Sequence, residues 1–167
     1  LGMVIQGEET TLPVSVEDML YHTQCVSNGL DNALLITDMP FLSFTSAEEA
    51  VLNAGLFMKQ GGAHMVKLEG GVDQADTVSA LNRNGIPVCA HLGLQPQYVH
   101  KIGGYLVQGR DESMAQKMIN DVGYVLPRNA YVPGRCPTLP PFREDPARQR
   151  SAQCDTDQSD NGELRSE

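Results

Sequence analysis

The sequence is poor in positive charge. Its 167 residues include 12 Lys and Arg against 21 Asp and Glu, so the formal net charge is −9 at pH 7. Such a chain is repelled by the phosphates of nucleic acids and by anionic membrane surfaces. We therefore expect no nucleic acid and no membrane among its partners.

Long hydrophobic runs and secretion signals are also lacking. No apolar stretch approaches the roughly 18–20 residues that a membrane-spanning helix needs, and the first six residues lack the charged and apolar regions of a signal peptide. The four cysteines are scattered without a CxxC pair, which favours reduced thiols in a cytoplasmic protein. Neither GxGxxG nor a P-loop pattern occurs, so we expect no nucleotide site.

The sequence does contain three short apolar runs, and each of them ends on a polar residue. The runs at 33–37, 65–68 and 86–90 are followed by Asp38, Glu69 and His91, respectively. A helix-like segment that closes on glycine or asparagine precedes each run. Strands that alternate with helices predict a parallel α/β fold. In such folds, functional side chains gather at the carboxyl ends of the strands.

Two segments begin with the signature of a helix cap. Ser15 followed by Asp18, and Ser46 followed by Glu49, have the spacing of a capping box, in which serine and acid each bind a free backbone amide of the other. Both segments continue with apolar residues at helical spacing and stop at glycine, which favours helix ends. We expect a helix after each serine.

Weaker signals predict two further helices. One is expected to begin at Asp73 or Asp76 and to end near Asn84, and another is expected to begin at Asp111. The resulting order of elements is helix, strand, helix, strand, helix, strand, loop and helix. This order fits part of a (β/α)8 barrel and also an open doubly wound sheet.

Length and composition favour a partial barrel. A complete (β/α)8 barrel takes about 250 residues, whereas only 1–122 read as foldable sequence. From Pro133 on, the chain holds five of its ten prolines and few apolar residues. We therefore expect a partial (β/α)8 TIM barrel of about three to four βα units over 1–122, and a Pro-rich, polar and disordered tail over 123–167.

Two of the strand ends carry carboxylates. Asp38 and Glu69 lie on successive predicted strands, which are commonly neighbours in a parallel sheet, so both carboxylates could hold one Mg²⁺ ion. Lys67 precedes Glu69 by two residues and would point to the same side of its strand, where it could meet an anionic substrate. The alternative is that both carboxylates merely cap secondary structure and that Lys67 pairs with one of them.

His91 ends the third predicted strand. It could act as a base or as a metal ligand, but a histidine that is hydrogen-bonded at a strand end explains it more simply. We favour the structural interpretation and assign His91 no catalytic role.

Taken together, six segments resemble the ketopantoate hydroxymethyltransferase family. The resemblance covers residues 1 to about 120. The matching segments are Leu1-Gly2-Met3-Val4, Thr11-Leu12-Pro13-Val14 followed by Glu17-Asp18-Met19 and Tyr21-His22-Thr23, Thr37-Asp38-Met39-Pro40-Phe41, Val66-Lys67-Leu68-Glu69-Gly70-Gly71, His91-Leu92-Gly93-Leu94 with Pro96-Gln97, and Gly103-Gly104-Tyr105 with Val107-Gln108-Gly109-Arg110.

This resemblance implies a homo-oligomeric, magnesium-dependent TIM-barrel enzyme of pantothenate biosynthesis. Such enzymes transfer a hydroxymethyl group from the folate co-substrate 5,10-methylenetetrahydrofolate to the keto acid 3-methyl-2-oxobutanoate, giving 2-dehydropantoate. By position in the motifs, Asp38 and Glu69 are metal-site residues, and Asp38 and Lys67 are substrate-binding residues.

The chain also departs from the family pattern. The family has a metal-site aspartate just before the segment that matches Leu1, and a general-base glutamate in a later strand. The corresponding later region, 125–131, contains no carboxylate. We therefore expect no catalytic base in this chain, which would be a fragment with an unrelated tail, produced by a frameshift for example.

Three functional hypotheses remain at this stage. The chain is a hydroxymethyltransferase or part of one, a non-catalytic truncated relic, or another magnesium-dependent keto-acid lyase of the same barrel superfamily. The resemblance favours the first hypothesis, that the chain belongs to the hydroxymethyltransferases. The missing base argues against catalytic activity of this chain alone.

Overall fold

The computed structural model describes residues 1–105, 108–125 and 130–131. The expected disordered tail over 123–167 therefore lies largely outside the described residues. Within that span, the structure describes the end of one helix and a two-residue strand, Ala130–Tyr131.

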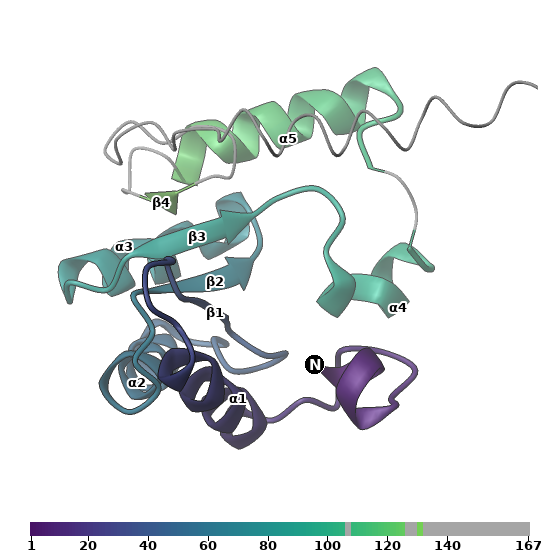
Figure 1. The fold of residues 1–167 in the computed structure, drawn as a ribbon. Coiled ribbons are helices and arrows are strands. Elements are labelled where there is room, and N and C mark those ends of the chain that lie inside the picture. The colour runs from purple at the N-terminus through teal and green to yellow at the C-terminus, as the bar shows by residue number, and fades with distance from the viewer. Residues whose placement is uncertain (106–107, 126–129, 132–167) are drawn as a thin grey trace, which may run out of the picture. The chain divides into compact units, whose positions relative to one another are not determined.

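Helices and strands alternate along the described chain (Figure 1). Short helical turns fill several loops. The elements are η1 (Gly2–Gln6), α1 (Val16–Asn28), β1 (Ile36–Asp38), α2 (Ala47–Lys59), β2 (Met65–Glu69), η2 (Val72–Gln74), α3 (Ala75–Arg83), β3 (Val88–His91), η3 (Pro96–Tyr98), α4 (Val99–Ile102), α5 (Glu112–Val125) and β4 (Ala130–Tyr131).

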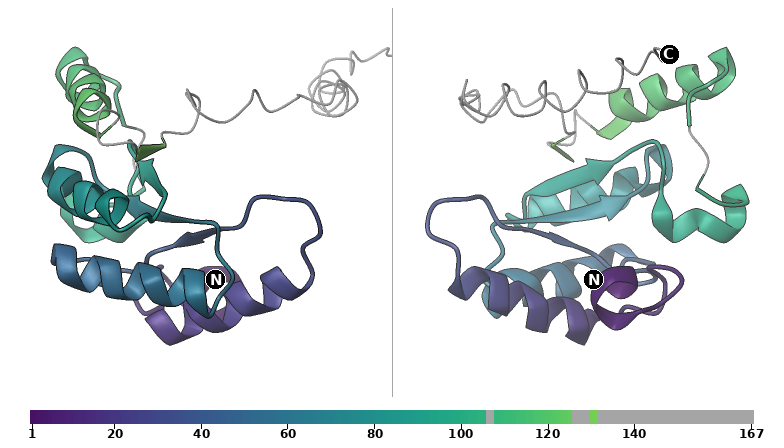
Figure 2. Two further views of the ribbon diagram at one scale, coloured as in Figure 1. Left: turned by 90° about the vertical axis from the view of Figure 1, so that its left-hand side faces the viewer. Right: turned by 45° about the vertical axis from the view of Figure 1, so that its right-hand side comes forward.

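The strands form one parallel sheet in the order β1-β2-β3-β4. Each strand pairs with the next along the chain, so every connection between them is a crossover. Helices α2, α3 and α5 lie on the same side of the strands (Figure 2, left). Successive parallel strands with helices on one side are the arrangement of a (β/α)8 barrel segment, and the predicted partial TIM barrel is confirmed.

The hydrophobic core lies between the sheet and these helices. Val66 and Leu68 of β2 are fully buried and belong to the same cluster as Phe57 of α2, Leu81 of α3 and Val125 of α5. Because alternate residues of a strand share a face, Lys67 and Glu69 of β2 lie on the face opposite to Val66 and Leu68. That face corresponds to the interior of a complete barrel.

The first predicted helix cap is confirmed in full. The Ser15 hydroxyl oxygen accepts a hydrogen bond from the Asp18 amide at 3.0 Å, and Asp18 Oδ2 accepts one from the Ser15 amide at 3.1 Å. The Ser15 hydroxyl also donates to Asp18 Oδ2 at 2.7 Å, and this bond, together with the one from the Ser15 amide, lowers the pKa of the Asp18 carboxyl below its usual value.

The second cap differs in one detail. Ser46 caps α2 by accepting from the Glu49 amide at 3.1 Å, but the Glu49 carboxylate reaches one residue further back, to the amide and hydroxyl of Thr45. The box is incomplete because the preceding threonine offers this carboxylate two donors.

The cap predicted for the third helix is wrong. Neither Asp73 nor Asp76 caps α3, which follows the 3₁₀ turn η2 directly and has Gln74 at its cap position without a side-chain bond. The fourth start is confirmed, since Asp111 Oδ1 accepts from the Met114 amide at 2.9 Å. That bond lowers the pKa of the Asp111 carboxyl.

No helix among the described residues is both long and apolar enough to cross a membrane. The helices of this part of the chain instead pack against one another, α2 against α1 and α3, and α3 against α5.

Buried Asp121 of α5 anchors the turn that follows β2. Its Oδ1 atom accepts from the Val72 amide at 3.1 Å, and its Oδ2 atom lies 2.8 Å from Lys117 Nζ. The carboxylate is so close to Gly71 that a Cβ there would lie 2.2 Å from Asp121 Cγ. Glycine at this position therefore lets α5 approach the end of β2.

We expect Gly71→Ala to lower the free energy of unfolding by about 2 kcal/mol, because the added methyl group must displace the Asp121 carboxylate. The control is Gly55→Ala within α2, where a Cβ meets nothing within 4 Å. This control should stabilise the protein by about 0.5–1 kcal/mol. Urea unfolding followed by circular dichroism measures both, and equal effects would contradict the anchoring role.

Candidate functional site

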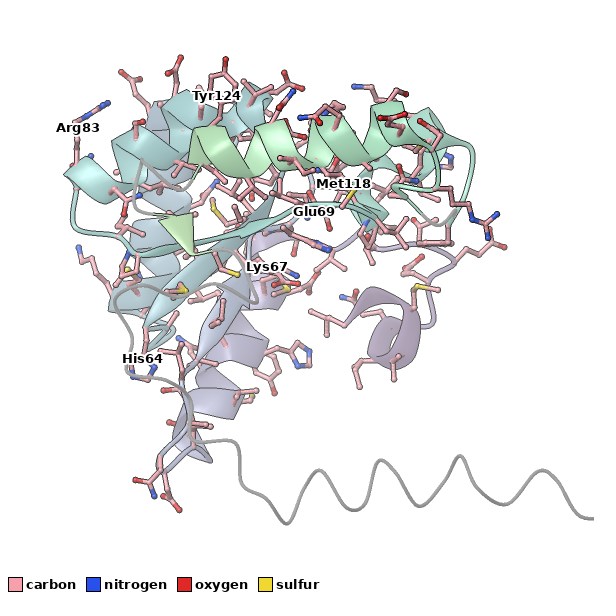
Figure 3. The ribbon with its side chains drawn as sticks, turned by 90° about the horizontal axis from the view of Figure 1, so that it is seen from above. His64, Lys67, Glu69, Arg83, Met118 and Tyr124 are labelled. Atoms are coloured by element: carbon pink, nitrogen blue, oxygen red, sulfur yellow. The ribbon has the colours of Figure 1, made fainter. Side chains whose placement is uncertain are left out.

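The sheet register brings the predicted site residues onto one face. Asp38 pairs with Lys67 across β1 and β2, and Glu69 pairs with His91 across β2 and β3. The four side chains therefore form two successive cross-strand pairs at the carboxyl end of the sheet. Figure 3 labels Lys67 and Glu69 on β2, the strand shared by both pairs.

Lys67 and Asp38 form a direct ion pair. Lys67 Nζ lies 2.7 Å from Asp38 Oδ2, with 26% of the lysine side chain and 53% of the aspartate side chain exposed. At this exposure such a pair contributes only about 0–1 kcal/mol to stability. The contact agrees with the sequence-based alternative that Lys67 pairs with a strand-end carboxylate, and it also holds a cation beside a carboxylate that solvent can reach.

Glu69 is enclosed, with only 6% of its side chain exposed. Its Oε2 atom accepts a hydrogen bond from the backbone amide of Gln97 at 3.0 Å, and its Oε1 atom lies 3.6 Å from His91 Nδ1. A buried carboxylate requires partners of this kind. Glu69 is thus held at a defined place by a segment that follows β3.

His91 lies beside Glu69 without forming a hydrogen bond to it. Its Nδ1 atom is buried and has no hydrogen-bond partner within the described part of the chain. The strand-end hydrogen bond that we expected from the sequence is therefore not seen for this nitrogen, and the role of His91 stays a prediction.

Cys89 occupies the same face between Lys67 and the next strand. It pairs in register with Lys67 on one side and with Tyr131 on the other, and it is 2% exposed. Burial raises the pKa of the Cys89 thiol, and the charge of Lys67 opposes this effect. Cys25 and Cys89 are both free cysteines, and Cys25 is exposed. Cys136 and Cys154 lie outside the described residues.

The donors at this face fit magnesium better than zinc. Asp38 and Glu69 offer carboxylate oxygens from adjacent strands, and Mg²⁺ commonly takes one or two carboxylates, completing its shell with waters and substrate oxygens. A structural zinc site needs about four nitrogen or sulfur ligands. Among the residues described, no group of three or more His, Cys, Asp or Glu could hold a metal. Gln97 Oε1, a buried acceptor to which no described residue donates a hydrogen bond, also lies in this region.

A separate hollow lies beside this face at the same end of the sheet. The turns after β2 and β3 contribute Gly70, Gly71 and Gly93 to it, and α4 and α5 contribute Lys101 and Lys117. None of Asp38, Lys67, Glu69 and His91 lines it. The hollow is therefore separate from the face that carries the four predicted site residues.

Sequence reasoning missed one residue of the site. Gln97 contacts Glu69 through its backbone and Met39 through its side chain, although it belongs to η3 and follows His91, the end of the third strand, by six residues. A glutamine in a loop has no distinctive spacing, and its position within the motif Pro96-Gln97 was the only available signal.

The fold and this face define a parallel α/β protein of the (β/α)-barrel type with acidic residues at the carboxyl ends of its strands. Comparison with known proteins narrows this class. The family model described as ketopantoate hydroxymethyltransferase matches residues 1–126. The chain belongs to the ketopantoate hydroxymethyltransferase family.

Individual relatives agree with this assignment. The chain is 60% identical over 121 residues to the 3-methyl-2-oxobutanoate hydroxymethyltransferase of Halorhodospira halophila, covering 72% of this chain and 44% of the relative. The enzymes of the same name from Alkalilimnicola ehrlichii and Colwellia psychrerythraea are 56% and 57% identical over 121 residues, covering 72% of this chain and 44% and 46% of the relatives. The chain thus spans less than half the length of these relatives.

The two free cysteines of the described chain should differ in reactivity. In a background with Cys136→Ser and Cys154→Ser, we expect Cys25 to react with a disulfide reagent at pH 8 at least tenfold faster than Cys89, because Cys89 is buried and its pKa is raised. Rates measured in Cys25→Ser and Cys89→Ser variants separate the two thiols. Equal rates would show that the sheet face around Cys89 is open.

Proposed function

We propose that this chain carries part of the site that transfers a hydroxymethyl group from 5,10-methylenetetrahydrofolate to 3-methyl-2-oxobutanoate, giving 2-dehydropantoate, with Mg²⁺ as the cofactor. The observation that carries the proposal is the convergence of Asp38, Lys67 and Glu69 on one face of β1 and β2. The family and the names of the relatives support the reaction type.

Asp38 and Glu69 would hold the metal ion. When bound, Mg²⁺ would polarise the keto group of the substrate and make the adjacent carbon more acidic. Glu69 is suited to a fixed ligand because its enclosed carboxylate already accepts a backbone hydrogen bond. Asp38, whose side chain is about half exposed, is suited to contact both the ion and an incoming substrate.

Lys67 would bind the substrate carboxylate. Its ammonium group lies 2.7 Å from Asp38 Oδ2, so binding of a cation at Asp38 would release Lys67 toward an anionic ligand on the same face. The lysine would also orient the keto acid, because a charge fixed on β2 selects one of the two ends of the substrate.

This chain alone is proposed to be inactive. Proton removal from the keto acid needs a base, and the segment 125–131, where the family resemblance places the glutamate, contains no carboxylate. We also propose that the protein forms a homo-oligomer and is located in the cytoplasm. We further propose that the chain is divided into a barrel part, 1–122, and a separate tail, 123–167.

We expect the purified chain to bind Mg²⁺ through Asp38 and Glu69. Calorimetric titration should give a binding heat that is lost in Asp38→Ala and in Glu69→Ala, because each variant removes one of the two carboxylate ligands. Asp76→Ala, an acidic residue of α3, is the matched control and should bind as the unmodified chain does. Binding that survives in both site variants would refute the metal assignment.

Turnover is the second test of the proposal. Incubation of the purified chain with Mg²⁺, 3-methyl-2-oxobutanoate and 5,10-methylenetetrahydrofolate should give no detectable 2-dehydropantoate by mass spectrometry, because the base is missing. A full-length relative, such as the enzyme from Halorhodospira halophila, serves as the positive control. Product formation that disappears in Asp38→Ala would show that the chain holds its own base.

A further inference from the structure

Gln97 connects the ends of two neighbouring strands. Its backbone amide donates to Glu69 Oε2 at 3.0 Å, at the end of β2. Its side-chain Nε2 donates to the backbone carbonyl of Met39 at 2.8 Å, directly after Asp38 at the end of β1. One residue from η3 thus contacts both strand ends that carry the proposed metal-site carboxylates.

The Met39 end of this connection is rigid. Met39 is fully buried, and its own amide donates to the Lys67 carbonyl at 2.7 Å, which continues the pairing of β1 with β2. A hydrogen bond to the Met39 carbonyl therefore acts on backbone that is already fixed to the sheet. Through its hydrogen bond to the Met39 carbonyl, the side chain of Gln97 holds the Gln97 backbone amide in position against Glu69.

The remaining polar atom of the Gln97 side chain, Oε1, has no hydrogen-bond partner within the described ranges of the chain. Nε2 faces the Met39 carbonyl, and Oε1 is buried without a hydrogen bond among the residues that the structure describes. Nearly all buried polar atoms are paired in native proteins. A buried acceptor left free on the residue whose backbone contacts Glu69 is suited to a hydrogen-bond donor that arrives with a ligand.

We propose that Gln97 is a positioning residue of this site, which fixes the Glu69 carboxylate relative to Asp38 by joining it to the Met39 carbonyl. The inference rests on the metal site proposed above. Gln97 acts through Glu69 and the β1 backbone, in the way that residues around a metal site orient its ligands. Loss of such a contact typically weakens metal binding about 10- to 100-fold.

The test is Mn²⁺ binding, with Mn²⁺ as a paramagnetic probe of a magnesium site, measured on the full chain by electron paramagnetic resonance of the free ion. Gln97→Met removes the Nε2 donor and approximately keeps the side-chain volume. Gln24→Ala is the matched control, because Gln24 Nε2 also donates to a backbone carbonyl, that of Gln60 at 3.2 Å, on another part of the fold. Each variant is also melted, with circular dichroism as the readout.

We expect Gln97→Met to bind Mn²⁺ at least about tenfold more weakly than the unmodified chain, with a melting temperature close to that of Gln24→Ala, which should bind normally. A purely structural role would lower the melting temperature and leave the affinity unchanged. Gln97→Ala repeats the comparison if Gln97→Met fails to fold, and failure of both variants to fold would overturn the inference by showing a structural role.

Two other results separate this inference from the proposed function. If the unmodified chain binds Mn²⁺ and Gln97→Met binds it equally well, the positioning role is wrong and the metal site stands. If the unmodified chain binds no Mn²⁺, the metal site is wrong, and the inference that depends on it is overturned as well.

Discussion

The in-register parallel pairing of β1, β2 and β3 is the constraint on which the other features depend. Because side chains alternate between the two faces of a strand, the pairing that directs Val66 and Leu68 into the core directs Lys67 and Glu69 to the opposite face. A shift of one residue would exchange the two sets. Burial of apolar side chains under α2 and α3 therefore also fixes the positions of the charged ones.

Contacts from outside the sheet fix the residues at the carboxyl end of β2. The carboxylate of Glu69 is enclosed because Gln97, from the segment after β3, donates to it, while Asp121 of α5 holds the turn that follows directly after β2. Both contacts join residues that are far apart in the sequence, so the geometry at the end of β2 depends on packing of the whole described domain. The sheet determines the direction in which each side chain points, and the loops provide the groups that contact it.

Local sequence patterns predicted the helices and strands better than the contacts between them. The order of helices and strands, the Ser15 cap and the strand-end places of Asp38, Glu69 and His91 follow from local patterns that have a direct physical cause. The cap of α3 was predicted wrongly because a 3₁₀ turn precedes this helix and replaces a side-chain cap. Gln97 was missed because its role arises from contacts with two strands, which no single-sequence spacing encodes.

This register places Asp38 and Glu69 on one face of the sheet, and the hydrogen bonds between the strands can be measured to test it. In isotope-labelled protein, scalar couplings through hydrogen bonds identify the carbonyl that each amide contacts. The observed register predicts a coupling from the Met39 amide to the Lys67 carbonyl and from the Gly70 amide to the His91 carbonyl. A coupling from the Met39 amide to the carbonyl of Val66 or Leu68 would place β1 one residue out of register and contradict this arrangement of the site face.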